Sequence, residues 1–348
     1  VLDDFFESEE VKVSLGTSAV SGTLAGPRTP GTAFVLGHHS LGTINGQKGA
    51  WGWARGGMGG ITQALAHAAR HFGAEIRTRA GVSRVLIRGS RAHGVELEDG
   101  TTLESKVVLS NLDPKRTFLG IVGKDHLPAE FHHAIERYRM DAASFKLNLA
   151  LRDLPDFSAV PGTQLQLHHR GIIDIAPSLD YLERAYEDAA HGRWSREPYI
   201  ELVVQSAVDP TLAPKGMHTL SASCKFAPFD LAGGSWDTEG ERCAEAILDT
   251  LEAYAPNIRK ILLAKTRITP LDMEREYGLT RGDVFHGAIF PYQMFSFRPV
   301  PGWSRYRTPV ERLYLCGAGA HPGGGVLGAP GHNAAMAVLE DWPAIQPA

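Results

Sequence analysis

Cysteine is scarce in this sequence, and the few cysteines lie far apart. Only three occur among the 348 residues, without a Cys-x-x-Cys pair or a Cys/His cluster: Cys224, Cys243 and Cys316. An odd number of scattered cysteines argues against a disulfide framework and a redox-active disulfide. The pattern is typical of a reducing compartment.

Long hydrophobic runs and blocks of like charge are also absent. No apolar stretch reaches the roughly 18 to 20 residues of a membrane-spanning helix, and no signal-peptide pattern occurs. The 35 basic and 39 acidic residues give a formal charge of only −4, so we expect no integral membrane segment and no nucleic-acid partner. Nucleophile-elbow, Walker and deaminase motifs are missing too, which leaves hydrolase and kinase functions without support.

Glycine, by contrast, is abundant and gathers near the C-terminus. Leu313 to Cys316 is a short apolar run that predicts a buried strand. Seven of the fifteen residues from Gly317 to Gly331 are glycine, which lets the backbone adopt positive φ and approach a ligand closely. Pro330 and Gly331 then open a predicted helix that is rich in alanine.

A strand, a glycine loop and a helix N-terminus together suit a phosphate or the electron-rich edge of a flavin, because unpaired N–H groups and a partial positive charge gather there. A dinucleotide fingerprint of the Rossmann type is rejected, since Pro322 and the glycines after it keep the chain irregular where that fingerprint needs a helix. The acidic residues that follow, Glu340 and Asp341, lie on the predicted helix rather than at the end of a second strand.

The order of residues in this stretch, GAG-x-HPGGG-V-x-GA-x-G-x-NAA, resembles the C-terminal flavin-contacting motif of the phytoene desaturase and monoamine oxidase group of FAD-dependent oxidoreductases, especially its desaturase-like form. The likeness extends upstream through Arg298-Pro299 and the Tyr306-x-Thr308-Pro309 segment. It implies an FAD cofactor and dehydrogenation, or redox-neutral isomerisation, of an apolar small molecule. The expected location is the cytoplasm for a bacterial protein and the mitochondrial matrix for a eukaryotic homologue.

The resemblance also assigns residues that contact the cofactor. In it, the backbone of Val82 pairs with the adenine edge, and Ser110 and Asn111 end the strand that approaches the nucleotide. Alternatively, Val82 is an ordinary strand residue and the Ser-Asn pair caps a helix that Pro114 begins. The remaining expected contacts lie in the glycine-rich stretch: Gly317, Ala318, Gly325, Val326 and Leu327.

Within that stretch, backbone N–H groups of Val326 and Leu327 would stabilise charge that develops on the flavin pyrimidine, unless the glycines form only a structural turn. His321 is the candidate catalytic residue, because an imidazole with a pKa of about 6.5 suits a proton donor or acceptor. Its alternative role is to shape the loop through a backbone hydrogen bond.

Three histidine pairs predict no metal site, because adjacent residues on a strand face opposite sides and no carboxylate or cysteine completes a ligand set. These pairs are His38-His39, His132-His133 and His168-His169. Aromatic residues gather between Phe285 and Tyr306, where they form an apolar substrate tunnel, a core or a partner surface. Arg298, within that region, faces the FAD pyrophosphate, a substrate anion or a structural ion-pair partner.

The expected fold is α/β plus α+β: an incomplete FAD-binding Rossmann-like domain, interleaved with a mixed-sheet substrate domain. The first βαβ unit is expected to be absent, because the chain opens at Val1 on a helical pattern without an initiator Met or a glycine fingerprint. We therefore expect the C-terminal portion of a longer protein or a naturally shortened homologue. The expected segments are 1–55 and 115–309 for the substrate domain, and 56–114 and 310–348 for the FAD domain.

Periodicity places the elements within these segments. Expected helices cover 61–72, 128–138, 179–190 and 237–254. Expected strands cover 75–78, 82–87, 93–97, 106–109, 144–152, 199–207, 217–226 and 264–269. Asp99-Gly100 predicts a hairpin turn between the strands at 93–97 and 106–109.

Two function classes compete on this evidence. The first is an FAD-dependent oxidoreductase of the desaturase type, with an amine oxidase as the enzymatic alternative. The second is a non-catalytic desaturase-like scaffold that acts through protein partners. Amine oxidation calls for an aromatic cage, a desaturase needs a long apolar tunnel, and a scaffold needs neither. Self-association is also expected, because apolar surface is left where the missing strands would pair.

Overall fold

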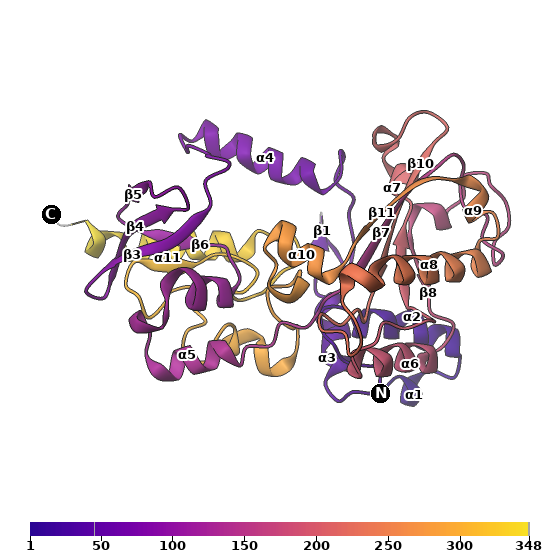
Figure 1. The fold of residues 1–348 in the computed structure, drawn as a ribbon, viewed down its shortest axis with the longest axis horizontal. Coiled ribbons are helices and arrows are strands. Elements are labelled where there is room, and N and C mark those ends of the chain that lie inside the picture. The colour runs from indigo at the N-terminus through magenta and orange to yellow at the C-terminus, as the bar shows by residue number, and fades with distance from the viewer. Residues whose placement is uncertain (45, 347–348) are drawn as a thin grey trace. The chain divides into compact units, whose positions relative to one another are not determined.

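The structure is a computed structural model that describes residues 1–44 and 46–346. It divides into two compact units, each built from two chain segments (Figure 1). Unit 1 comprises Val1–Ile76 and Ala143–Tyr277, and unit 2 comprises Arg77–Ala142 and Gly278–Ala348. These divisions differ from the expected domain boundaries at 56, 115 and 310, which stay predictions. Residues 45, 347 and 348, within the expected segments 1–55 and 310–348, lie outside the described residues.

Unit 1 is organised around a five-stranded sheet in the order β11-β7-β10-β9-β8. All its pairings are antiparallel. Of the two expected arrangements, antiparallel or mixed, the antiparallel sheet is confirmed and the mixed sheet is wrong, because each strand runs opposite to its neighbours. Its strands are β7 (Phe145–Leu151), β8 (Ile172–Ile175), β9 (Ile200–Val203), β10 (His218–Cys224) and β11 (Leu262–Ile268). A separate hairpin pairs β1 (Thr43–Ile44) with β2 (Gln47–Lys48).

Alternation along the central strand β7 explains where the core of unit 1 lies. Every second residue from Phe145 to Leu151 is buried, because alternate side chains of a strand point to the same face of the sheet. That face carries the apolar layer. Helix α8 packs into that layer through Ile247, Leu248 and Leu251. The two expected helices at 179–190 and 237–254 are confirmed as α6 and α8.

The helices of unit 1 are α1 (Leu2–Phe5), α2 (Glu9–Ala19), α3 (Thr32–His39), α4 (Met58–His71), α6 (Leu179–Ala190), α7 (Gln205–Val208), α8 (Trp236–Tyr254), α9 (Ile258–Ile261) and α10 (Pro270–Tyr277). Short 3-10 turns cover His168–Arg170 and Pro210–Leu212. Ser8 and Ser178 cap α2 and α6 by accepting from backbone N–H groups three residues on, as N-cap serines do.

Two expected strands differ from the structure. Residues 75–78 form no strand, because this segment follows α4 as exposed irregular chain without a paired neighbour in the described residues. The expected strand at 199–207 ends at Val203, where the chain turns into α7. Strand β8 was not predicted, and it completes the edge of the sheet by pairing with β9.

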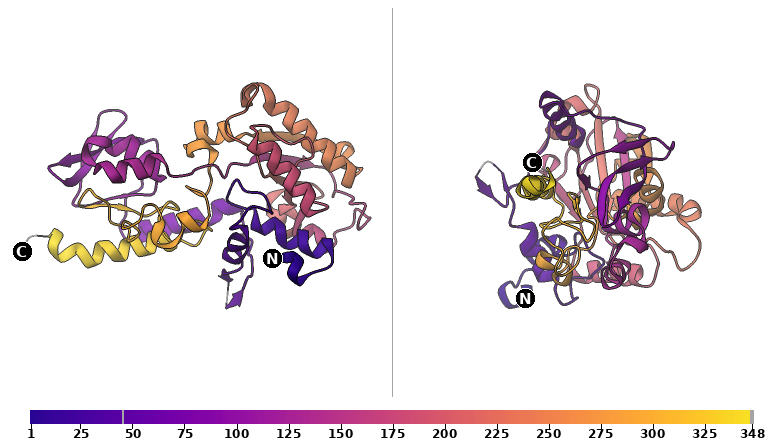
Figure 2. Two further views of the ribbon diagram at one scale, coloured as in Figure 1. Left: turned by 90° about the horizontal axis from the view of Figure 1, so that it is seen from below. Right: turned by 90° about the vertical axis from the view of Figure 1, so that its left-hand side faces the viewer.

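Unit 2 contains a three-stranded meander and a short parallel pair. The meander joins β3 (Val82–Arg88), β4 (Arg91–Leu97) and β5 (Thr102–Glu104), and the parallel pair joins β6 (Val108–Ser110) to β12 (Leu313–Leu315). Its longer helices are α5 (Ala129–Glu136) and α11 (Ala329–Ile345), and Figure 2 shows α11 as the last helix of the chain. Shorter turns cover Arg116–Val122 (a π-helix), Lys124–His126, Thr280–Gly282, Pro291–Gln293 and Phe295–Phe297.

A single apolar cluster ties these elements of unit 2 together. It includes Val85 from the meander, Phe118 and Phe131 from the helical segments, and Leu313 and Leu315 from β12, all buried. The rings of Phe118 and Phe131 meet edge to face at 4.7 Å, an arrangement favoured by aromatic quadrupoles. This core fixes the strand from which the glycine-rich stretch emerges.

Candidate functional site

The carboxyl ends of β6 and β12 lie side by side in unit 2. Ser110 is paired with Leu315, and the Cys316 N–H donates to the Ser110 carbonyl at 2.9 Å. A β-carbon on Gly317 would lie 2.4 Å from the carbonyl oxygen of Asn111. Only glycine therefore allows the two segments to stay this close just after the strands end. The structure thus brings Ser110, Asn111 and Gly317 to one sheet edge, where parallel strands commonly present ligand sites.

The side chains at this edge do not all face outward. Ser110 is buried, and its hydroxyl lies 2.8 Å from that of Thr117 in the following helical segment. The proposed capping role belongs instead to Asp113, whose carboxylate accepts from the Arg116 N–H at 3.0 Å. Asn111 is exposed. Any nucleotide contact at Ser110 therefore passes through its backbone, whereas the Asn111 side chain is accessible.

The glycine loop exposes a row of backbone donors. From Gly324 to Leu327, no backbone N–H group pairs with another backbone group in the described chain, and Ala329 and Gly331 are likewise unpaired at the start of α11. Val326 and Leu327 are 64% and 60% exposed. Such an array of free N–H groups at a helix N-terminus favours an electron-rich ligand.

Backbone strain marks the same loop. Gly325 has φ +123°, and Val326 has φ +56°, a left-handed conformation that a β-branched residue adopts only at a cost. Side-chain burial does not explain this conformation, because Val326 faces solvent. Strained backbone of this kind is concentrated at ligand-binding segments.

Arg298 binds the backbone of the segment that leads into the loop. Its side chain is completely buried, at 0% exposure, and its Nε and Nη2 atoms donate to the Ala318 carbonyl at 3.0 and 2.8 Å. Nη2 also donates to the Phe285 carbonyl at 2.8 Å. The expected ion-pair partner is not found: no carboxylate lies within 4.0 Å of Arg298 in the described residues, and its donors are used by backbone carbonyls. Arg298 therefore joins the aromatic segment to the segment that carries Ala318.

His321 lies just before the glycine loop in the sequence. Burial, followed by the charge of Arg298, lowers the pKa of His321, so its imidazole is neutral near pH 7. Its Nδ1 atom is buried and has no hydrogen-bond partner within the described chain. The backbone hydrogen bond suggested as its alternative role is therefore not seen at Nδ1. His286 has the same features: its Nδ1 is buried without a described partner, and burial lowers its pKa.

Val82 belongs to the meander rather than to the parallel pair. It opens β3, is partly buried, and pairs with Leu97 of β4. The Glu98 N–H donates to the Gly81 carbonyl at 2.8 Å just before it. The Asp99-Gly100 turn is confirmed, with the Thr101 N–H donating to the Asp99 carboxylate at 2.9 Å. It joins β4 to β5, however, and not to the expected strand at 106–109, which pairs with β12 instead. Val82 is thus the first residue of an ordinary paired strand, and the adenine contact at Val82 stays a prediction.

The aromatic segment of unit 2 is divided between core and surface. Met294 is buried, whereas Tyr292, Phe295 and Phe297 are about half exposed. The Phe295 ring lies 6.3 Å from that of His321, which places an accessible aromatic side chain beside the glycine loop. Part of this segment therefore belongs to the core, as expected, while the substrate tunnel and the partner surface stay predictions.

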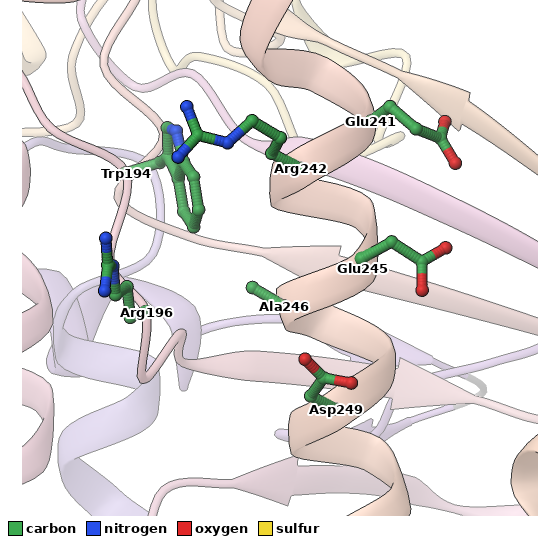
Figure 3. Close-up of a pocket in the computed structure, with 7 residues that line it drawn as sticks. All are labelled: Trp194, Arg196, Glu241, Arg242, Glu245, Ala246 and Asp249. Carbon is green, nitrogen blue, oxygen red and sulfur yellow. The ribbon is translucent and has the colours of Figure 1, made fainter.

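Unit 1 carries a groove between α8 and the segment that precedes β9 (Figure 3). It is lined by Trp194, Arg196, Glu241, Arg242, Glu245, Ala246 and Asp249. Its acidic side chains already pair with cations: Arg259 contacts Glu245 at 3.1 Å and Asp249 at 2.5 Å. A charged, internally paired groove of this kind does not resemble an apolar substrate site.

Searches of the described residues for other sites give two results. No group of three or more His, Cys, Asp or Glu side chains is arranged to hold a metal ion there. Nor does any helix in the described part of the chain have the length and apolar character needed to cross a membrane.

Comparison with known proteins defines the class to which this site is similar. No protein-family model matches the chain. Its sequence is 28% identical to a lycopene-forming phytoene desaturase of Pantoea ananas over 84% of this chain and 57% of that protein. A crystal structure of an oxidoreductase from Methanosarcina mazei has a TM-score of 0.53 and 20% identity, covering 82% of this chain and 55% of that one. The latter likeness shows the fold.

A second sequence relative is more similar in sequence. The chain is 43% identical to pyridine nucleotide-disulfide oxidoreductase domain-containing protein 2 of Rattus norvegicus, over 98% of this chain and 60% of that protein. Together these matches confirm the resemblance to the phytoene desaturase-like FAD-dependent oxidoreductases, and with it FAD as the cofactor of the class. The chain spans about 60% of the length of the curated relatives it matches.

Sequence reasoning missed two contributors to the site. Asp113 lies beside the predicted Ser110-Asn111 pair, and its position just before Pro114 is a capping signal that the sequence did carry. Asp283 is buried, and its carboxylate accepts from the Phe285 N–H at 2.9 Å. Nothing in the local sequence around Asp283 indicates that burial.

Proposed function

We propose that this chain supplies the flavin-contacting part of an FAD-dependent oxidoreductase that dehydrogenates or isomerises an apolar small molecule. The observation that carries the proposal is the strained glycine loop between β12 and α11, in which successive N–H groups have no backbone partner in the described chain. The 28% identity to a phytoene desaturase supports the apolar substrate class over an amine.

The residues present fit the ring end of the cofactor. The backbone N–H groups from Gly324 to Leu327, with those of Ala329 and Gly331 in α11, have no backbone partner in the described chain, and Gly325 and Val326 have positive φ. Donors in such a row stabilise negative charge without reorganising. The phosphate-binding glycine fingerprint is not among these 348 residues, so none of them is assigned to the FAD pyrophosphate.

Within this site, each residue has a limited role. FAD, when bound, supplies the electron-accepting chemistry. The loop N–H groups of Val326 and Leu327 hold the acceptor edge, and Gly317 and Ala318 shape the end of β12. His321, neutral and unpaired at Nδ1, is suited to accept or hold one proton beside the ring. Phe295, half exposed and with its ring 6.3 Å from that of His321, offers an apolar surface beside the loop.

The proposal is tested on the protein in its full encoded length, purified and examined for flavin absorbance. We expect stoichiometric FAD and at least tenfold weaker FAD binding in G325A, because alanine at φ +123° deforms the donor row. G162A is the matched control: Gly162 has the same φ but lies in unit 1, so it should leave FAD affinity unchanged. A full-length protein without flavin, or equal FAD loss in both variants, would reject the proposal and favour the scaffold alternative.

A further inference from the structure

Arg298 is a buried cation without a contacting anion. Its side chain is 0% exposed, and in the described part of the chain its hydrogen bonds go to backbone carbonyls and to the Met294 sulfur, not to a carboxylate. Burying a charge in this way is costly unless its donors are satisfied, and here carbonyl dipoles satisfy them. Carbonyls solvate the guanidinium but leave its net charge uncancelled.

This charge lies directly behind the glycine loop. A β-carbon added to Gly323 would be 3.7 Å from Nε of Arg298 and 4.0 Å from its Cζ, so no side chain lies between the guanidinium and the loop backbone at this glycine. Two donors of Arg298 also bind the Ala318 carbonyl, one residue after Gly317. Because Arg298 is completely buried, its charge is screened less by water than a surface charge would be, and it acts on a ligand bound at the loop.

The other ionisable groups around Arg298 do not neutralise it by contact. Asp283 uses its oxygens for the N–H groups of Phe285 and Ala142 at 2.9 and 3.3 Å, and Asp113 accepts from Thr280 at 2.7 Å. His286 and His321 both have pKa values lowered by burial and by Arg298. Arg298 is one of the causes that lower both pKa values, and Asp113 acts in the opposite direction on the pKa of His286.

We propose that Arg298 sets the reduction potential of the bound flavin, by placing a positive charge behind the loop that favours the reduced, anionic ring over the oxidised, neutral one. The inference rests on the proposed function. Two electrons and one proton convert the oxidised ring to an anion, so a nearby cation stabilises the reduced product and raises the potential. Arg298 does not touch the reacting atoms. It acts on them electrostatically, through the loop.

The test compares flavin potentials in full-length protein carrying R298K, R298Q or R298M. Lysine keeps the charge and loses the fork of donors, glutamine keeps a donor and loses the charge, and methionine loses both. We expect R298K to retain the wild-type potential. In R298Q and R298M, the equilibrium constant for flavin reduction should be at least tenfold smaller. That corresponds to a reduction potential lower by about 30 mV for a two-electron couple. Thermal unfolding of each variant measures structural damage separately.

The outcomes distinguish this inference from the proposed function. Wild-type protein without flavin would reject both. Wild-type flavin with an unchanged potential in R298Q or R298M rejects the role of Arg298 alone. An R298K potential as low as that of R298Q, or loss of flavin from R298K, would show that donor geometry matters rather than charge, and also overturns the inference. Flavin retained at wild-type potential by R298K but lost from both neutral variants supports it.

Discussion

Gly317 follows β12 where that strand ends beside the end of β6. An added β-carbon would meet the carbonyl oxygen of Asn111 at 2.4 Å, and backbone atoms of that residue leave no room for adjustment. We expect G317A to lose roughly 1 to 3 kcal/mol of unfolding free energy by overpacking, and to weaken FAD binding in the full-length protein.

Gly331 offers the control for that substitution. Its β-carbon would have only the Cys316 carbonyl nearby, at 3.8 Å, and it lies within α11, where alanine is the better helix former. G331A should therefore unfold at the same temperature as the wild type or higher. Equal melting temperatures for G317A and wild type, measured by circular dichroism, would contradict the packing argument.

Asp283 gives a prediction for the dependence of stability on pH. Burial raises the pKa of its carboxyl from 3.8 to about 6, so the folded chain holds this proton at pH values where the unfolded chain has released it. The protonated Asp283 therefore contributes fully to the free energy of unfolding below about pH 4. This contribution, about 3 kcal/mol, is lost as the pH rises through about 6.

The measurement is urea unfolding of wild type and D283N at about pH 4 and about pH 7. Asparagine cannot ionise, so the loss of stability between the two pH values should be smaller in D283N by roughly that amount. D125N is the control, because Asp125 is exposed in a short turn of the same unit. Parallel pH profiles for wild type and D283N would show that Asp283 is not held protonated.

At the scale of elements, α4 and α8 differ in what holds them in place. Helix α8 buries a stripe of apolar residues against the unit 1 sheet, whereas α4 has no buried residue and exposes Leu65 by 63%. A helix of 14 residues without tertiary packing is marginal in water. We expect amides of α4 to exchange with solvent hydrogen much faster than those of α8, as hydrogen-exchange mass spectrometry can measure.

Slow exchange in α4 within the 348-residue chain would contradict the prediction.

At the scale of the whole molecule, the parallel sheet of unit 2 consists of only two strands, β6 and β12, in the described residues. Parallel strands are ordinarily buried on both faces, yet β6 pairs only with β12 in the described residues, and Leu109, Leu112, Met336 and Leu339 are exposed. We expect the 348-residue chain to self-associate through these exposed apolar residues and to bind FAD weakly or not at all.

Sedimentation across a range of concentrations and FAD titration check both expectations. L339E should shift the association equilibrium toward monomer, because it places a charge in the apolar surface without disturbing a buried contact. E340Q changes a neighbouring exposed charge and is the control. A strictly monomeric 348-residue chain that retains stoichiometric flavin would refute the prediction.

Local patterns in the sequence determined much of this protein. Glycine and proline placement located the loop and the start of α11, apolar periodicity located α6, α8 and most strands, and Asp99-Gly100 fixed a hairpin. These features depend on neighbours only a few residues away, so the sequence shows them directly. The motif order in the glycine-rich stretch also pointed to the class of cofactor.

Only the tertiary structure decided the rest. The sheet of unit 1 proved antiparallel because strand partners are chosen by packing across long sequence separations. The burial of Arg298 and Asp283 likewise depends on segments that local periodicity cannot place. Arg298 looked like a ligand for an anion, yet carbonyls from residues 285 to 318 surround it. A charged side chain shows its role only when the groups that solvate it are known.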